Sequence, residues 1–90
     1  MTRLSLELHR TFEKQFAKLP VKRRDKVIDA IDRFLDDPTN PILRNHELAG
    51  EWAIFRSISA GGDLRLHFQI TDGGTVVYFV AVGTHSQLYK

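Results

Sequence analysis

The spacing of apolar residues differs between the two halves of the chain. Phe12, Phe16 and Leu19 recur at intervals of four and three residues, and a second set with helical spacing occupies residues 27–35. Each set predicts an amphipathic helix with one apolar face. Pro20 is expected in the break between the helices, because proline suits a first turn and not a helix interior. A pair of prolines soon after the second set ends that helix.

Segments with strand patterns flank the two helices. Residues 4–8 alternate apolar and polar side chains, which predicts a short half-buried strand at an edge of a sheet. Three apolar segments at 52–58, 64–70 and 76–82 follow the helices, separated by glycine-rich turns at 60–62 and 72–74, and a short tail ends the chain. The aromatic residues of the first of these segments are expected in the core. The order β-α-α-β-β-β predicts an α+β fold in which two helices pack on one face of an antiparallel sheet.

Alternation along the predicted strand 64–70 separates two sets of side chains. The apolar set is expected to face the helices and the polar set to face the open side of the sheet. The apolar set consists of Leu64, Leu66, Phe68 and Ile70, and the polar set of Arg65, His67 and Gln69. Function is expected on the open face, because the helices cover the other one.

The composition excludes several classes of protein. At 90 residues and 10.3 kDa, the chain is expected to form a single domain, residues 1–90. It contains no cysteine, which excludes a disulfide scaffold, a thiol nucleophile and a cysteine zinc site. The longest apolar stretch, Val76 to Val82, is too short to span a membrane, and the N-terminus has no apolar run of the signal-peptide type. We therefore expect a cytoplasmic protein without a membrane partner.

Positive charge is concentrated in the first half of the chain, although the net charge is only +2. Residues 1–44 hold 10 Lys and Arg against 7 Asp and Glu, whereas residues 45–90 hold 3 against 4, together with three of the four histidines. The predicted helices carry a basic region made up of Lys14, Lys18, Lys22, Arg23, Arg24 and Lys26. This basic region is either a solvated face or a surface that binds the backbone of ribosomal RNA.

The candidate chemistry is carried by scattered residues, because no standard catalytic or cofactor motif is present. The histidines at 9, 46, 67 and 85 lack metal-ligand spacing, so neither a metal nor a cofactor is expected. Arginine can hold a phosphate, and imidazole can take or give a proton near neutral pH. With a carboxylate and a tyrosine nearby, these groups suit metal-free RNA cleavage. A base takes the 2′-OH proton, the oxygen attacks phosphorus, and an acid protonates the leaving 5′-oxygen.

Four stretches of the sequence resemble the RelE/ParE superfamily of bacterial toxin–antitoxin toxins, and most of all its YafQ-like branch. They are Asn45–Trp52, Phe55–Arg56, Gly62–Leu66 and Val82–Tyr89, with His-x-Leu-x-Gly-x-Trp and Gly-Thr-His-x-x-Leu-aromatic as the most specific pieces. The resemblance covers essentially the whole chain and implies a fold like that of small microbial ribonucleases. It also implies a type II toxin that cuts mRNA in the ribosomal decoding site. Such a toxin is neutralised by a cognate antitoxin and meets DNA only through the antitoxin complex.

The resemblance implies catalytic roles for three residues. His85 corresponds to the histidine most often treated as the general acid of the branch, His46 to a catalytic-site histidine, and Asp63 to an acidic site residue. Which of His46 and Asp63 is the base stays open. Without the resemblance, His46 could equally make a structural hydrogen bond, and Asp63 is an ordinary turn residue.

Four further residues are expected to bind the substrate. Arg65 corresponds to the strand arginine that contacts the scissile phosphate in the wider RelE group, and Tyr89 to a terminal aromatic that stacks on or orients the substrate. Arg56 and His67 are the other two. For these two a structural role is the alternative, in which Arg56 supports the sheet through hydrogen bonds and His67 lines the site.

Two positions depart from the pattern of the branch. Ser59 stands where the branch has a second histidine, and Leu64 where it has a tryptophan, so the acid/base set is thinner. The sequence predicts a ribosome-dependent mRNA endoribonuclease with reduced activity or altered sequence preference as possible consequences of these losses. Two alternatives remain: a ParE-like inhibitor of DNA gyrase, which needs no acid/base residues, and a catalytically weak homologue that only binds its antitoxin.

Overall fold

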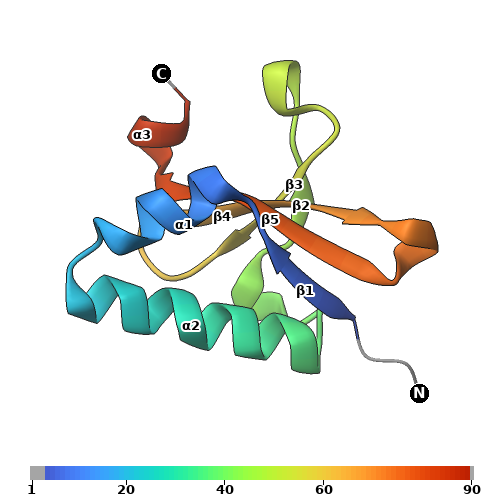
Figure 1. The fold of residues 1–90 in the computed structure, drawn as a ribbon, viewed down its shortest axis with the longest axis horizontal. Helices are drawn as coiled ribbons and strands as arrows, with labels where there is room; N and C mark the ends of the chain where they lie inside the picture. Colours follow the sequence, from blue (N-terminus) through green and yellow to red (C-terminus); the bar gives the residue numbers. More distant parts are fainter. Residues whose placement is uncertain (1–3, 90) are drawn as a thin grey trace.

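The computed structural model describes residues 4–89, which form one five-stranded sheet with helices on both faces (Figure 1). The strands are β1 (Ser5–Leu8), β2 (His46–Glu47), β3 (Arg56–Ser59), β4 (Leu64–Thr71) and β5 (Val76–Thr84). The helices are α1 (Arg10–Ala17), α2 (Val21–Asp36) and α3 (His85–Leu88), with 3₁₀ turns at Pro41–Leu43 (η1), Gly50–Trp52 (η2) and Asp72–Gly74 (η3). None of the helices within residues 4–89 has the length and apolarity needed to cross a bilayer.

The α+β fold and the two packed helices are confirmed, but the sheet is mixed rather than antiparallel. Its strand order is β1-β5-β4-β3-β2, and β1 lies at an edge, as predicted, running parallel to β5 from Ser5 opposite Val76 to Leu8 opposite Phe79. A strand joined to the rest of the sheet by two helices is free to pair in parallel, unlike one joined by a tight hairpin. The opposite edge is the two-residue strand β2, which the apolar pattern had not predicted.

The segment predicted as a strand over 52–58 contains a strand only from Arg56 onward. Before it, η2 begins at Gly50, which has a φ of +64°, and Phe55 N donates to Trp52 O at 2.8 Å. These turns hold an apolar run in a loop, so Ile54 is 69% exposed. The prediction of a continuous strand was wrong because apolar side chains can also reach the sheet from a loop that lies over it.

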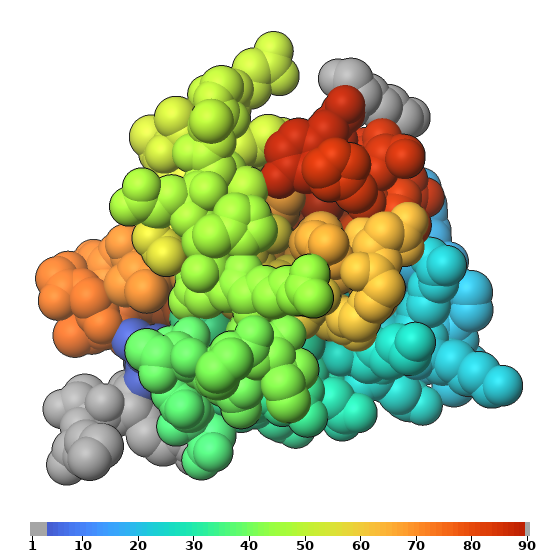
Figure 2. All heavy atoms as spheres, turned by 180° about the vertical axis from the view of Figure 1, so that it is seen from behind, coloured from blue at the N-terminus to red at the C-terminus, as the bar shows by residue number. Residues whose placement is uncertain are grey.

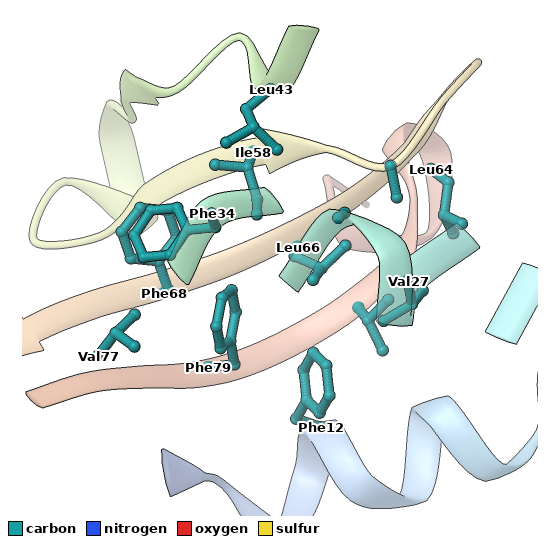
Figure 3. Packing of buried hydrophobic residues seen from close by; sticks show 13 residues of the cluster. Phe12, Val27, Phe34, Leu43, Ile58, Leu64, Leu66, Phe68, Val77 and Phe79 are labelled. Atoms are coloured by element: carbon teal, nitrogen blue, oxygen red, sulfur yellow. The ribbon is translucent and has the colours of Figure 1, made fainter. Parts of the chain in front are cut away.

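The hydrophobic core lies between the two long helices and the inner face of the sheet (Figure 3). Phe34 of α2 has its ring centroid 4.9 Å from Phe68 and 5.9 Å from Phe79, and Phe12 of α1 lies 5.8 Å from Phe79. All four rings are buried. The rest of the buried cluster is Val27, Ala30, Leu43, Ile58, Ala60, Leu64, Leu66, Val77 and Val82. The core packs the inner face of the sheet against α1 and α2, which leaves the other face available for a site.

A β-bulge interrupts the alternation on β5. His67 lies opposite Ala81 but Phe68 opposite Phe79, which leaves Val80 as the extra residue. Beyond the bulge the β4–β5 hairpin projects past the helices (Figure 1), and Ile70 is 42% exposed there. Ile70 lies on the predicted face, opposite the core residue Val77, but the helices do not cover it there, whereas the other three apolar residues of β4 are in the core.

Candidate active site

The candidate site lies on the face of the sheet opposite α1 and α2. Two rows of cross-strand neighbours cross this face: Ser59, Arg65 and Gly83 in one, and His46, Ser57, His67 and Ala81 in the other. The small residues in these rows leave room for α3 and η2 to lie over the sheet. Figure 2 shows α3 in red against the yellow and orange β3–β4 segment, with the green β2 segment beside it.

Helix α3 positions His85, where the sequence had predicted only a tail. Its first turn is closed by a capping box: Gln87 N donates to Thr84 Oγ1 at 3.2 Å, and Thr84 N donates to Gln87 Oε1 at 2.8 Å. His85 N donates to Asp63 O at 3.0 Å, which ties the helix to the β3–β4 turn. A Cβ atom on Gly83 would lie 2.9 Å from Gln87 Oε1, so a larger residue there requires the Gln87 amide to move.

Aromatic side chains from three segments meet above β4. The hydroxyl of Tyr89 lies 3.2 Å from His67 Nε2, and its ring centroid is 4.4 Å from that of His85. Trp52 has its ring 4.4 Å from His67 and donates from Nε1 to Leu88 O at 3.3 Å. Trp52 therefore joins η2 to α3 across the open face and is not in the main core, where it was expected.

His67 is directed to the open face, as alternation predicted, but it is fully buried there. Burial, followed by the nearby His46 and His85, lowers the pKa of His67 from 6.5 to about 4, so the ring is neutral at pH 7. Its Nδ1 and the hydroxyl of Ser57, directly opposite on β3, are both buried without a hydrogen-bond partner among the described residues. Trp52 and Tyr89 lie against this imidazole on the open face.

His46 is exposed on β2 at the end of the row that contains His67. Its Nδ1 lies 2.7 Å from Arg44 O. A carbonyl oxygen only accepts, so Nδ1 carries the hydrogen of this bond. Arg44 supports this contact from a left-handed conformation with a φ of +51°.

Arg65 lies in the neighbouring row and is held by the β3–β4 turn. Its Nη1 donates to Gly62 O at 2.8 Å and to Ser59 Oγ at 3.3 Å. Ser59 Oγ also accepts from Gly61 N at 3.1 Å. The serine that replaces a histidine of the branch therefore orients the guanidinium. Burial raises the pKa of Tyr89, an effect that Arg65 opposes, so the phenol is protonated at neutral pH.

The side chains of two predicted site residues, Asp63 and Arg56, lie outside this group of His46, His67, Arg65, His85 and Tyr89. Asp63 is exposed, and it contacts α3 through its backbone carbonyl. Arg56 shares the helix-side face of β3 with the core residue Ile58. There its Nε donates to Asn45 Oδ1 at 2.9 Å, and its Nη1 lies 3.5 Å from Glu47 Oε1. Arg56 thus supports the short strand β2, which was the alternative interpretation.

Leu64, which stands where the branch has tryptophan, is 3% exposed in the core and presents nothing to the site. Sequence reasoning had missed three contributors: Trp52, Ser57 and Gln87. The last had a readable signal, since Thr84-x-x-Gln87 is the pattern of a capping box.

The site therefore presents two exposed imidazoles, His46 and His85, on the face that also holds the buried imidazole of His67. The Arg65 guanidinium lies in the neighbouring row of this face, and the Tyr89 phenol lies against His67 and His85. Within residues 4–89, no group of three His, Cys, Asp or Glu side chains converges in the manner of metal ligands. These groups can transfer protons and hold an anionic oxygen.

Comparison with known proteins gives consistent similarities. A family profile described as "Bacterial toxin of type II toxin-antitoxin system, YafQ" matches residues 4–90. The fold is similar to that of YafQ from E. coli BL21(DE3) (22% identity, 98% of this chain and 100% of that chain, TM-score 0.77). It is also similar to a chain of the E. coli DinJ–YafQ toxin–antitoxin complex (22% identity, 98% of this chain and 99% of that chain, TM-score 0.75). The conserved hypothetical protein HP0894 from Helicobacter pylori shares 29% identity over 96% of this chain and 99% of that chain, with a TM-score of 0.68. No curated protein matches significantly.

Proposed function

The chain belongs to the YafQ family of toxins of bacterial type II toxin–antitoxin systems, and from this membership we propose that it is an endoribonuclease that cleaves mRNA on the ribosome. One observation supports the enzymatic part above all others: His46 and His85 are far apart in the sequence, yet both belong to the open face around His67. His46 ends the cross-strand row that contains His67, and His85 packs on Tyr89, whose hydroxyl lies 3.2 Å from His67 Nε2. A protein that acted only by binding would need no such pair.

The proposed reaction is a transfer at phosphorus without a metal. His46 Nε2 takes the proton of the 2′-hydroxyl, and the freed oxygen forms a bond to the adjacent phosphorus. The bond from phosphorus to the 5′-oxygen breaks, and His85 gives that oxygen its proton. The products carry a 2′,3′-cyclic phosphate and a 5′-hydroxyl, and the two imidazoles end with their protonation states exchanged.

His46 is better suited than Asp63 to the role of base. Its Nδ1 is engaged with Arg44 O, which orients the ring and leaves Nε2 available to the substrate. The carboxylate of Asp63 makes no hydrogen bond or ion pair with another residue in the range 4–89, and only its carbonyl contacts His85. We therefore assign Asp63 the role of placing the first turn of α3.

Arg65 and Tyr89 are proposed to hold the RNA. The guanidinium Nη1 is anchored to the β3–β4 turn, so its other nitrogen atoms can donate to a phosphoryl oxygen whose charge increases during attack. The exposed ring of Tyr89 offers a surface for stacking a base. The basic region of α1 and α2 is largely exposed and is proposed to contact the backbone of ribosomal RNA.

A cognate antitoxin is proposed to bind the side of the molecule away from this site. YafQ of E. coli has been crystallised in a toxin–antitoxin complex with DinJ. In the present chain an apolar groove of about 460 Å³ runs between β1 and the two long helices. It is lined by the apolar residues Leu6, Leu8, Phe12, Phe16, Ile28 and Ile31, together with the acidic residues Glu13 and Asp32. Because β1 is an edge strand, a segment of the antitoxin can fill this groove and also pair with the free edge.

Primer extension on a reporter mRNA tests the proposal. Programmed ribosomes are incubated with the purified protein, with His85→Ala, or with Ser86→Ala. Ser86 is the matched control because it is an exposed polar residue of the same helix. We expect cuts that require ribosomes, are retained in Ser86→Ala and fall by about 100-fold or more in His85→Ala.

Three outcomes would contradict parts of the proposal. Full-rate cleavage by His85→Ala would remove that residue from the mechanism. DNA damage signalling on expression, without mRNA cuts, would favour a gyrase inhibitor. Harmless expression without an antitoxin would favour a homologue that only binds its partner.

A further inference from the structure

His67 has properties that a substrate-contacting residue lacks. Its side chain is fully buried, with Trp52 at a ring distance of 4.4 Å and Tyr89 at 5.4 Å. Its lowered pKa, about 4, keeps the ring neutral where the proposed reaction would run. Burial disfavours the charged imidazolium, so this ring offers no positive charge to a phosphate.

The hydroxyl of Tyr89 is the hydrogen-bond partner of this imidazole, at 3.2 Å from Nε2. A neutral imidazole has one donor and one acceptor nitrogen. If Nε2 accepts from the phenol, Nδ1 carries the hydrogen. In the structure this Nδ1 and the hydroxyl of Ser57, opposite His67 on β3, are both buried without a partner, so the bond to Tyr89 is the one side-chain hydrogen bond of the imidazole among residues 4–89. The phenol keeps its own proton for this bond because burial raises the pKa of Tyr89.

Tyr89 in turn lies against His85. The two rings have centroids 4.4 Å apart and are tilted by 34°, and Tyr89 N donates to His85 O at 3.0 Å. Helix α3 is only four residues long, and a single turn is not stable by itself. Its position therefore depends on anchors to the sheet, and the Tyr89 hydroxyl provides such an anchor from the ring that touches the candidate general acid.

We propose that His67 is a positioning residue: its buried imidazole holds the hydroxyl of Tyr89, and the ring of Tyr89 sets the orientation of the His85 imidazole. His67 does not touch the RNA. The effect on cleavage rests on the proposed nuclease function, whereas the orientation of His85 exists in the free protein.

A double-mutant cycle tests the connection through catalysis. Tyr89→Phe removes the hydroxyl and keeps the stacking ring, and His67→Leu removes the acceptor. If both act through one hydrogen bond, each variant lowers kcat by about tenfold with little change in KM, and the double variant is no slower than the worse single variant. His67→Gln, whose amide oxygen can still accept from the phenol, should recover most of the rate. Multiplicative losses in the double variant would overturn the proposal.

The ring resonances of His85 in the free protein give a readout independent of cleavage. We expect Tyr89→Phe and His67→Leu to shift these resonances alike, whereas Ser86→Ala leaves them unchanged. Unaltered His85 resonances in Tyr89→Phe would refute the positioning role, even if His67→Leu failed to fold. If the wild-type protein cleaved no RNA, the proposed function would fail while this comparison still decided the positioning.

Discussion

Replacing Gly83 by alanine tests whether close packing of α3 on the sheet sets the activity of the site. Gly83 lies within β5, directly below α3, and an added Cβ would stand 2.9 Å from Gln87 Oε1 and 3.5 Å from Leu88 Cδ2. The second distance is an ordinary contact, but the first requires the Gln87 amide to move. That amide accepts the hydrogen bond from Thr84 N at 2.8 Å, so moving it opens the capping box.

The cost follows from the bond that is lost. A helix cap contributes about 1 kcal/mol, and crowding of a packed interface adds a similar amount, which gives about 1–2 kcal/mol in the free energy of unfolding. For a domain of this size each kcal/mol lowers the Tm by about 4–8 °C. Activity should fall further than stability, by about 10-fold to 100-fold, because displacement of α3 by about 1 Å carries His85 out of reach of the leaving oxygen.

Gly74→Ala provides the matched control. Gly74 has a φ of +92° with no other atom near its Cβ position, and it lies in the hairpin at the far end of β4 and β5. Alanine there is strained by about 1–2 kcal/mol, so its effect on stability should be similar. The Tm of both variants is measured by thermal unfolding, and their ribosome-dependent cleavage is measured at 25 °C. Equal loss of cleavage in the two variants, or wild-type Tm and cleavage in Gly83→Ala, would refute the role assigned to the packing.

Three other predictions concern the core, the pH dependence and the partner surface. Phe34→Ala should lower the free energy of unfolding in urea by about 3–5 kcal/mol, because the ring is fully buried against two others; a loss below about 1 kcal/mol would contradict this packing. The pKa of His67 falls from 6.5 to about 4 on folding, so the unfolded chain binds more protons between these values. The contribution of His67 to the free energy of unfolding should be fully present above pH 6.5, and the free energy, measured by urea titration, should fall by up to about 3 kcal/mol toward pH 4. If His67→Leu showed the same dependence of this free energy on pH as the wild type, another group would be responsible. Ile28→Glu places a charge in the apolar groove at a side chain that is already 47% exposed; it should abolish co-purification with the antitoxin and leave mRNA cleavage intact, and undiminished co-purification would place the partner elsewhere.

The local periodicity of the sequence was sufficient for most of the fold. Helical spacing predicted both long helices and the burial of Phe12 and Phe34, and the period of two predicted which face of β4 each of Leu66 and His67 occupies. These features could be read because they depend on the geometry of one element, in which a repeat of 3.6 or 2 residues places apolar side chains on one side.

Features that depend on contacts between distant segments were not readable in this way. The parallel pairing of β1 depends on how the two helices return the chain to the sheet. The apolar loop at 52–55 was mistaken for a strand because its local pattern does not show that Trp52 contacts the distant helix α3 instead of a neighbouring strand. The motif of the branch pointed to His46 and His85, but no spacing in the chain shows that both lie beside the same imidazole.

His67 illustrates the difference between what the local pattern of one strand determines and what contacts between distant segments determine. Its position on the open face follows from alternation along one strand, which the sequence determines by itself. Whether that face is open at His67 depends on Trp52 and on Tyr89, the latter 22 residues away in the chain, and only the tertiary structure brings them over the imidazole. Burial is a property of everything that surrounds a side chain. The residue expected to face the substrate is for that reason a neutral, buried acceptor beneath the site.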